Sequence, residues 1–112
     1  MIGVGRWGKN HLRILARTPG AEVTAVFDTD EKSRAYVRQT HQAVWLGQTT
    51  SEIIDRSDAV VIATPSSLHG RLAWAALEKG RHVFVEKPLS MTFREARSIA
   101  KLAKRKKCVL QV

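Results

Sequence analysis

Three glycines near the start of the chain have the spacing of a nucleotide-binding turn. Gly3, Gly5 and Gly8 form the pattern G-x-G-x-x-G and are followed directly by a segment of helical spacing. The first glycine allows a tight turn, the second lets the backbone approach a pyrophosphate, and the third lets a helix pack closely on a strand. The free amide groups of the first helical turn, around Arg6 and Trp7, then face the phosphates. The pattern predicts a dinucleotide site, although glycine-rich turns also occur without a ligand.

An acidic residue stands where such a site needs one. Asp28 lies twenty residues after Gly8, at the end of a run rich in β-branched residues. A carboxylate there can accept hydrogen bonds from both hydroxyls of an adenosine ribose. The same charge repels a 2′-phosphate, which favours NAD over NADP, although Lys32 and Arg34 lie close enough in sequence to keep NADP open. The structural alternative for Asp28 is a local Asx turn or a helix cap.

A second group of polar residues follows an apolar run. Thr64, Pro65 and His69 lie at the carboxyl end of a predicted buried strand, where ligands of open α/β sheets bind. Ser66 or Ser67 is most simply explained as the N-cap of the next helix. His69 in the first helical turn either faces a ligand or packs and hydrogen-bonds to the backbone. The positive end of the helix disfavours its protonated form.

The third candidate is the segment Glu86-Lys87-Pro88, which follows the apolar residues 82–85. A lysine at the carboxyl end of a strand, beside a cofactor, can donate a hydrogen bond to a substrate hydroxyl. Pro88 restricts Lys87 to extended conformations and so fixes the direction of its side chain. A surface turn is the alternative explanation for this segment.

The segments that position these residues alternate between the two-residue hydrophobic period of a strand and the 3.6-residue period of a helix. Short apolar or β-branched runs alternate with stretches of helical spacing, which predicts a parallel sheet built from right-handed crossovers. The run Asp58 to Ala63 has no polar alternation, so both faces of that strand should be covered. We therefore predict a Rossmann-type, doubly wound α/β fold with helices on both faces of a mainly parallel sheet. The predicted strands are 22–27, 43–46, 58–63, 81–85 and 108–112. The predicted helices are 7–18, 30–40, a short one at 52–56, one from 68 to its C-cap Gly80, and a last one that begins at the capping box of Thr92 and Glu95 and keeps core spacing to Ala103.

The first strand of such a fold fits the sequence poorly. Only Met1 and Ile2 precede the first glycine, yet this strand is central in a doubly wound sheet. We expect the start of the chain to be clipped or its short strand to be compensated by a neighbour.

Length and composition set the remaining limits. The chain has 112 residues, one cysteine (Cys108) and a formal net charge of +9. That length fits one domain, and one cysteine excludes a disulfide framework and a multi-cysteine zinc site; no metal site is predicted. The longest apolar run, Leu72 to Leu77, is too short to cross a bilayer, and there is no signal-peptide core. We expect a cytoplasmic protein without a membrane partner.

The positive charge is concentrated near the end of the chain. Residues 91–112 contain seven Lys or Arg and one Glu, which gives +6 of the total. Cations near the carboxyl end of a helix complement its dipole, and a surface helix needs a polar face. No aromatic residue lies among these charges to stack bases, so nucleic-acid binding is not expected.

The candidate motifs occur together in the order and spacing of one protein family. The glycine turn, Asp28, the segment Ala63-Thr64-Pro65 with His69, and Glu86-Lys87-Pro88 resemble the cofactor domain of the glucose-fructose oxidoreductase, inositol dehydrogenase and rhizopine-catabolism family (Gfo/Idh/MocA). The resemblance covers essentially the whole chain, and the Glu-Lys-Pro segment is its most specific part.

This resemblance implies an NAD(P)-dependent oxidoreductase that moves a hydride between a CH–OH group of a sugar or polyol and nicotinamide. It implies that Lys87 is the catalytic residue and contacts the substrate hydroxyl, and that the peptide before Pro88 is cis. The tryptophan at position 7 of the glycine turn resembles the branch of the family that contains sugar and nucleotide-sugar dehydrogenases. The cofactor-binding residues predicted or implied are Gly3, Gly5, Arg6, Trp7, Gly8, Asp28, Thr64, Pro65, His69, Glu86 and Lys87.

The chain departs from the family in length. Members carry a second α/β domain with the remaining catalytic residues and much of the oligomer interface, and this domain is absent from residues 1–112. We expect those residues to be a single dinucleotide-binding domain that turns over no substrate alone, and the full-length form to be a homo-oligomer. The alternative is a stand-alone, non-catalytic dinucleotide-binding or sensing module.

Overall fold

The computed structural model describes all residues from 1 to 112, and its strands are parallel. β1 (Ala25–Val26) pairs with β2 (Trp45–Leu46). β3 (Ala59–Ile62) pairs with β4 (His82–Val85), which also pairs with β5 (Leu110–Gln111). Every pair is joined by a crossover through a helix, which is the arrangement of a βαβ unit.

The short first segment joins these two groups of strands. Ile2 forms parallel bridges to Phe27 on one side and to Ile62 on the other. Its amide donates to the carbonyl of Val61 at 2.8 Å, and its carbonyl accepts from Ala63 at 2.9 Å. The order across the sheet is therefore β2, β1, the Met1-Ile2 segment, β3, β4 and β5. This is the order of a dinucleotide-binding Rossmann sheet, and the predicted fold class is confirmed.

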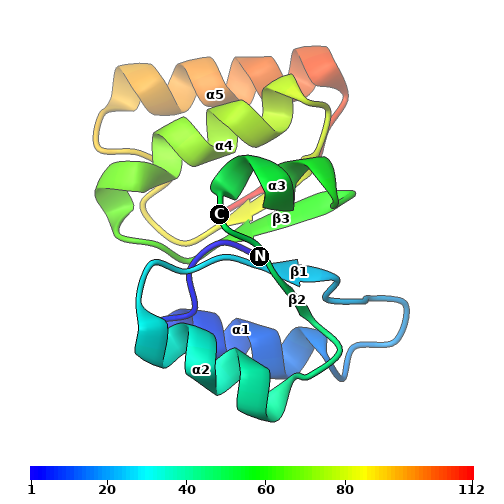
Figure 1. Cartoon of the computed structure of the whole chain (residues 1–112). Coiled ribbons are helices and arrows are strands. Elements are labelled where there is room, and N and C mark those ends of the chain that lie inside the picture. The colour runs from blue at the N-terminus through cyan, green and yellow to red at the C-terminus, as the bar shows by residue number, and fades with distance from the viewer.

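Helices cover both faces of this sheet. In Figure 1, α1 and α2 lie on one side of the strands, and α3, α4 and α5 lie on the other. Their bounds are α1 (Arg6–Leu15), α2 (Glu31–Thr40), α3 (Thr50–Asp55), α4 (His69–Glu78) and α5 (Phe93–Lys106), with a 3₁₀ turn, η1 (Ser66–Leu68), before α4.

The sheet separates two hydrophobic cores, as the apolar run of β3 predicts. Val60 and Ile62 of this strand belong to the core under α3, α4 and α5. Val61 packs against the smaller core formed with α1 and α2, around Leu12 and Val37. Because successive side chains of a strand point to opposite faces, a strand with both faces covered must be apolar throughout.

Only some of the helices begin with the side-chain N-caps that the sequence predicts. Asp30 caps α2 and Thr92 caps α5 through hydrogen bonds from the amides of Ser33 and Glu95. The interpretation of Ser66 or Ser67 as an N-cap is wrong, because both lie in η1 and α4 begins without a side-chain cap. The 3₁₀ turn takes the place of that cap.

Two other helix predictions need correction. α3 begins earlier than predicted because Thr49 and Glu52 form a reciprocal capping box. α1 ends at Leu15, three residues before the predicted end. No helix in the chain is both long enough and apolar enough to cross a bilayer.

Candidate functional site

The predicted site residues surround one cleft at the carboxyl ends of the strands. The cleft has a volume of about 660 Å³. It lies between the glycine turn, the end of β1, the start of α3 and the segment that follows β3. Its lining residues are Ile2, Gly3, Gly5, Arg6, Trp7, Phe27, Asp28, Thr29, Gln48, Thr49, Thr50, Ala63, Thr64, Pro65, Leu68, Arg71 and Leu72.

The glycines of the turn meet different surroundings. Gly3 has φ of +90°, and a Cβ atom on it would lie 2.6 Å from the carbonyl oxygen of Ala63. A Cβ atom on Gly8 would overlap the carbonyl oxygen of Gly3. Around Gly5, by contrast, no protein atom lies within 4 Å of such a Cβ. Gly3 and Gly8 are therefore required by the protein's own packing, whereas Gly5 leaves open space in the cleft.

The start of α1 faces this space with free donors. Gly5 is the N-cap residue, no side chain caps the helix, and its first turn contains no acidic residue. Arg6 and Trp7 are exposed at the cleft. Uncapped amides and the positive end of the helix dipole favour an anion such as a pyrophosphate. The residues present thus fit a dinucleotide at this position.

Asp28 lies at the same cleft and also stabilises the turn. Its carboxylate accepts from the amide of Val4 at 2.6 Å and from the amide of Asp30 at 2.8 Å. The second contact is the Asx turn that was the alternative explanation, so the residue both forms the turn and lines the cleft. The guanidinium of Arg34 donates to the carbonyl of Gly47 at 2.8 Å and to the carbonyl of Asp28 at 3.4 Å.

A second hollow of about 300 Å³ continues the cleft towards β4. Trp7, Ala63 and Thr64 line both spaces, so the two are contiguous. The other lining residues of the hollow are Ser66, His69, Glu86 and Lys87. The structure therefore brings the glycine turn, the segment after β3 and the Glu-Lys-Pro segment together at one site.

The Glu86-Lys87-Pro88 segment has the conformation that the family resemblance implies. The peptide between Lys87 and Pro88 is cis. Lys87 is exposed, and Glu86 contacts His11 of α1 at 2.7 Å. This hydrogen bond from His11 holds the pKa of the Glu86 carboxyl below its usual value. Glu86 therefore stays charged beside Lys87.

His69 bonds to the backbone, which was one of its two predicted roles. The side chain is 2% exposed. Nδ1 lies 2.8 Å from the carbonyl oxygen of Pro88, and Nε2 lies 2.8 Å from the carbonyl oxygen of Thr64. The imidazole thus links the segment after β3 to the segment after β4, and it also lines the hollow.

Sequence reasoning missed several residues of the cleft. Gln48, Thr49 and Thr50 follow β2, and the rule that singled out the residues after β3 would also have found these. Arg71 lies one helical turn after Leu68, and both line the cleft. Arg71 thus adds a second cation, besides Arg6, to the lining of the cleft.

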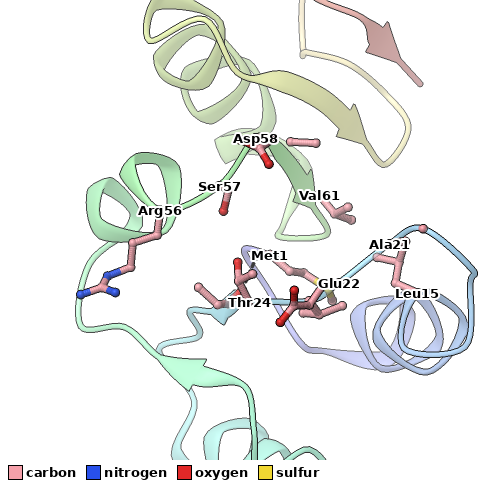
Figure 2. Close-up of a pocket in the computed structure, with 13 residues that line it drawn as sticks. Met1, Leu15, Ala21, Glu22, Thr24, Arg56, Ser57, Asp58 and Val61 are labelled. Atoms are coloured by element: carbon pink, nitrogen blue, oxygen red, sulfur yellow. Dashed lines mark hydrogen bonds between the residues drawn. The ribbon is translucent and has the colours of Figure 1, made fainter.

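A hollow of about 290 Å³ at the opposite edge of the sheet contains none of the predicted site residues. Figure 2 shows Met1 between Thr24 and Glu22 on one side and Ser57 and Asp58 on the other. The amino group of Met1 donates to the carbonyl of Ala25 at 2.6 Å. This hollow lies at the amino ends of the strands.

Comparison with known proteins identifies the family. The sequence profile of an oxidoreductase family with an NAD-binding Rossmann fold, Gfo/Idh/MocA, matches residues 1–112. The chain belongs to this family. It is an NAD(P)-binding oxidoreductase domain of the Gfo/Idh/MocA type, with the motifs at the positions described above.

Individual Gfo/Idh/MocA relatives and structural neighbours agree with this assignment. Inositol 2-dehydrogenase 1 of Paenarthrobacter aurescens (strain TC1) is 40% identical over 94 residues, which cover 80% of this chain and 28% of that protein. Biliverdin reductase of Synechocystis sp. PCC 6803, solved with biliverdin and NADP+, is 28% identical with a TM-score of 0.94, covering 99% of this chain and 35% of that one. GenD2 from gentamicin A biosynthesis, solved with NAD, is 31% identical with a TM-score of 0.90, covering 98% and 32%.

The chain spans about a third of the length of the curated relatives that it matches. Neighbours of this fold hold either NAD or NADP. The shared feature of the Gfo/Idh/MocA domain is thus a Rossmann site for a nicotinamide dinucleotide.

Proposed function

We propose that residues 1–112 are a single dinucleotide-binding domain of an oxidoreductase that transfers a hydride between a sugar or polyol and nicotinamide. The observation that carries this proposal is the continuity of the cleft, which extends from Asp28 past the glycine turn to Lys87. An inositol dehydrogenase among the relatives supports a polyol as the substrate class.

Each part of the cleft has a task in this proposal. Asp28 accepts hydrogen bonds from the adenosine ribose, and the free amides at Arg6 and Trp7 bind the pyrophosphate. Thr64, Pro65 and the neighbouring His69 line the nicotinamide side. When bound there, the nicotinamide supplies a centre that accepts or gives a hydride.

Lys87 is the proposed catalytic residue. Its ammonium group donates a hydrogen bond to the substrate oxygen, and in the direction of reduction it gives this oxygen the proton that completes the hydroxyl. Glu86 keeps a negative charge next to it, because His11 holds the pKa of this carboxyl low. The exposure of Lys87 leaves its hollow open on one side, so we expect no turnover of inositol or sugars by the 112-residue chain alone.

The charges of the adenosine end favour NAD over NADP. The Asp28 carboxylate lies at the cleft and would repel a 2′-phosphate. Arg34, the buried cation closest to it in sequence, is held by the carbonyl of Gly47. Lys32 is exposed and makes no contact that directs it to the cleft.

A calorimetric titration of the 112-residue chain with NADH and with NADPH tests this proposal. We expect saturable binding of NADH and weaker binding of NADPH. Asp28→Asn should weaken NADH binding roughly tenfold or more, because a hydrogen bond to a charged group contributes about 1.5–3 kcal/mol. Asp58→Asn is the matched control, since Asp58 is exposed at the opposite edge of the sheet.

Two results would count against the proposal. A folded chain that binds neither dinucleotide would exclude a functional site in residues 1–112, and tighter binding of NADPH would overturn the role given to Asp28. The cytoplasmic location and the homo-oligomer remain predictions for the full-length protein.

A further inference from the structure

Both neighbours of the proposed catalytic lysine are held by histidines from different helices. Lys87 itself is exposed. The residue before it, Glu86, is bonded to His11 of α1, and the carbonyl of the residue after it, Pro88, is bonded to His69 of α4. The glycine turn and the predicted motifs account for neither contact.

The first contact is fixed on both sides. His11 Nε2 lies 2.7 Å from Glu86 Oε1, and the two side chains are 22% and 24% exposed. The imidazole also packs edge to face on the ring of Phe84, with centroids 5.1 Å apart. Because Phe84 belongs to β4, the contact ties Glu86 to a rigid strand and to the helix that follows the glycine turn.

The second contact is buried and involves both ring nitrogens of His69. His69 is 2% exposed, and each of its ring nitrogens lies 2.8 Å from a carbonyl oxygen, one of Pro88 and one of Thr64. A carbonyl oxygen only accepts hydrogen bonds, so each nitrogen must donate. A neutral imidazole carries one N–H group and can serve only one of these oxygens, whereas an imidazolium serves both.

We propose that His11 and His69 are positioning residues that hold the Glu86-Lys87-Pro88 segment from its two ends. This inference rests on the proposed function, because it concerns the placement of Lys87 towards a substrate. His11 holds the side chain of Glu86, and His69 holds the backbone carbonyl of Pro88, so both neighbours of Lys87 are restrained. Lys87 is thereby placed without a side-chain bond of its own.

Nuclear magnetic resonance of the 112-residue chain, without cofactor, tests this proposal. Long-range proton–nitrogen spectra report which ring nitrogens of His69 carry protons, and nitrogen relaxation reports the mobility of the Lys87 backbone amide. We expect Nδ1 of His69, the nitrogen that contacts the Pro88 carbonyl, to carry a proton. We expect the Lys87 amide to have an order parameter near the rigid value of about 0.85.

Variants separate positioning from general stability. His11→Ala and His69→Ala should lower the order parameter of the Lys87 amide towards the flexible value of about 0.6, with β4 amides unchanged. His11→Gln keeps a donor near Glu86 and should restore the rigid value. Each lost hydrogen bond should lower the population of the held position roughly two- to tenfold.

His69 is buried, so its alanine variant could unfold the chain. His69→Gln keeps a donor for Thr64 only and should mobilise Lys87, whereas His69→Asn keeps a donor for Pro88 only and should mobilise it less. The ring-nitrogen measurement on the unaltered chain needs no variant at all.

Two results would overturn the proposal. The first is an equally rigid Lys87 amide in folded alanine variants, and the second is a His69 Nδ1 without a proton, which would leave the Pro88 carbonyl unheld. A loss of NADH binding by the unaltered chain would instead count against the proposed function, because the histidine measurements are made without cofactor.

Discussion

At the scale of single residues, the glycine turn separates folding from binding. Gly3 is needed because its backbone has positive φ and approaches Ala63, whereas Gly5 has ordinary backbone angles and open space above it. The same motif thus contains two glycines that the fold requires, Gly3 and Gly8, and one, Gly5, that it does not require.

Alanine substitutions should reveal this difference. Gly3→Ala should destabilise the fold by roughly 1–3 kcal/mol or more, because it combines a strained backbone with a steric overlap. Gly5→Ala should change the free energy of unfolding by less than about 1 kcal/mol yet weaken NADH binding, since its methyl group fills the cleft. Urea unfolding and calorimetry of both variants measure the two effects.

Equal destabilisation by both substitutions would contradict this division of roles. So would unchanged NADH affinity in Gly5→Ala, because the cleft would then have room that a bound pyrophosphate does not use.

The residues found from sequence are those whose type is unusual for their position. The glycine spacing, Asp28 after a strand and a lysine before proline are visible without a structure. Arg71 and Gln48 are ordinary surface residue types, and only the arrangement of α4 and β2 around the cleft gives them a place in it. The bond from His69 to Pro88 joins residues nineteen positions apart, which local patterns do not reveal.

At the scale of elements, the first strand is the shortest part of the sheet and the most central. Met1 and Ile2 are buried, with the amino group of Met1 bonded to Ala25. Beyond this group lies the hollow of Figure 2, between residues 22–25 of one strand region and 57–61 of the other. Its walls are spaced for one more stretch of parallel strand.

An extended segment joined to Met1 should therefore stabilise the chain. We expect a variant with Val-Ile-Val placed before Met1 to melt several degrees higher, because about 1 kcal/mol raises Tm by roughly 4–8 °C in a domain of this size. The extension adds backbone pairing on two sides and converts the buried amino group into an amide. A Gly-Pro-Gly extension is the matched control, since proline cannot donate to the ladder.

Equal melting temperatures of the two extended chains, measured by circular dichroism, would show that the added residues do not form a strand in the hollow.

Element types were predictable from the sequence, but their lengths were not. The alternation of apolar runs and helical spacing predicted a parallel, doubly wound sheet with right-handed crossovers. The predicted strand 22–27 shrank to Ala25–Val26 because pairing ends where the neighbouring Met1-Ile2 segment ends. Strand bounds depend on the partner strand, which a local pattern does not contain.

At the scale of the whole molecule, folding is linked to pH through the buried amino group. Burial lowers the pKa of the Met1 amino group from 8.0 to about 5. Between these values the unfolded chain binds a proton that the folded chain does not, so stability rises with pH across this window. The lowered pKa of Glu86 adds a loss of stability at lower pH, once this carboxyl is protonated and its bond to His11 weakens.

The 112-residue chain should therefore be less stable at pH 5.5 than at pH 8. A shift of three pKa units corresponds to at most about 4 kcal/mol, measured as the free energy of unfolding in urea. Acetylation of the amino group removes the titrating group and should flatten this part of the pH profile. Identical profiles for both forms would show that the amino group of Met1 does not carry this pH dependence.

The two groups of strands are connected only at Ile2 and its neighbours, and this connection affects the cooperativity of unfolding. The β1-β2 ladder and the β3-β4-β5 ladder share no hydrogen bond except through residues 1–3. Such a molecule can open in parts, so amide protons of β1 and β2 should exchange with solvent by a smaller opening than those of β3 and β4. A dinucleotide that reaches from Asp28 to Lys87 touches both parts, and its binding energy then opposes their separation. Cofactor binding would turn two loosely joined halves into one unit that opens only as a whole.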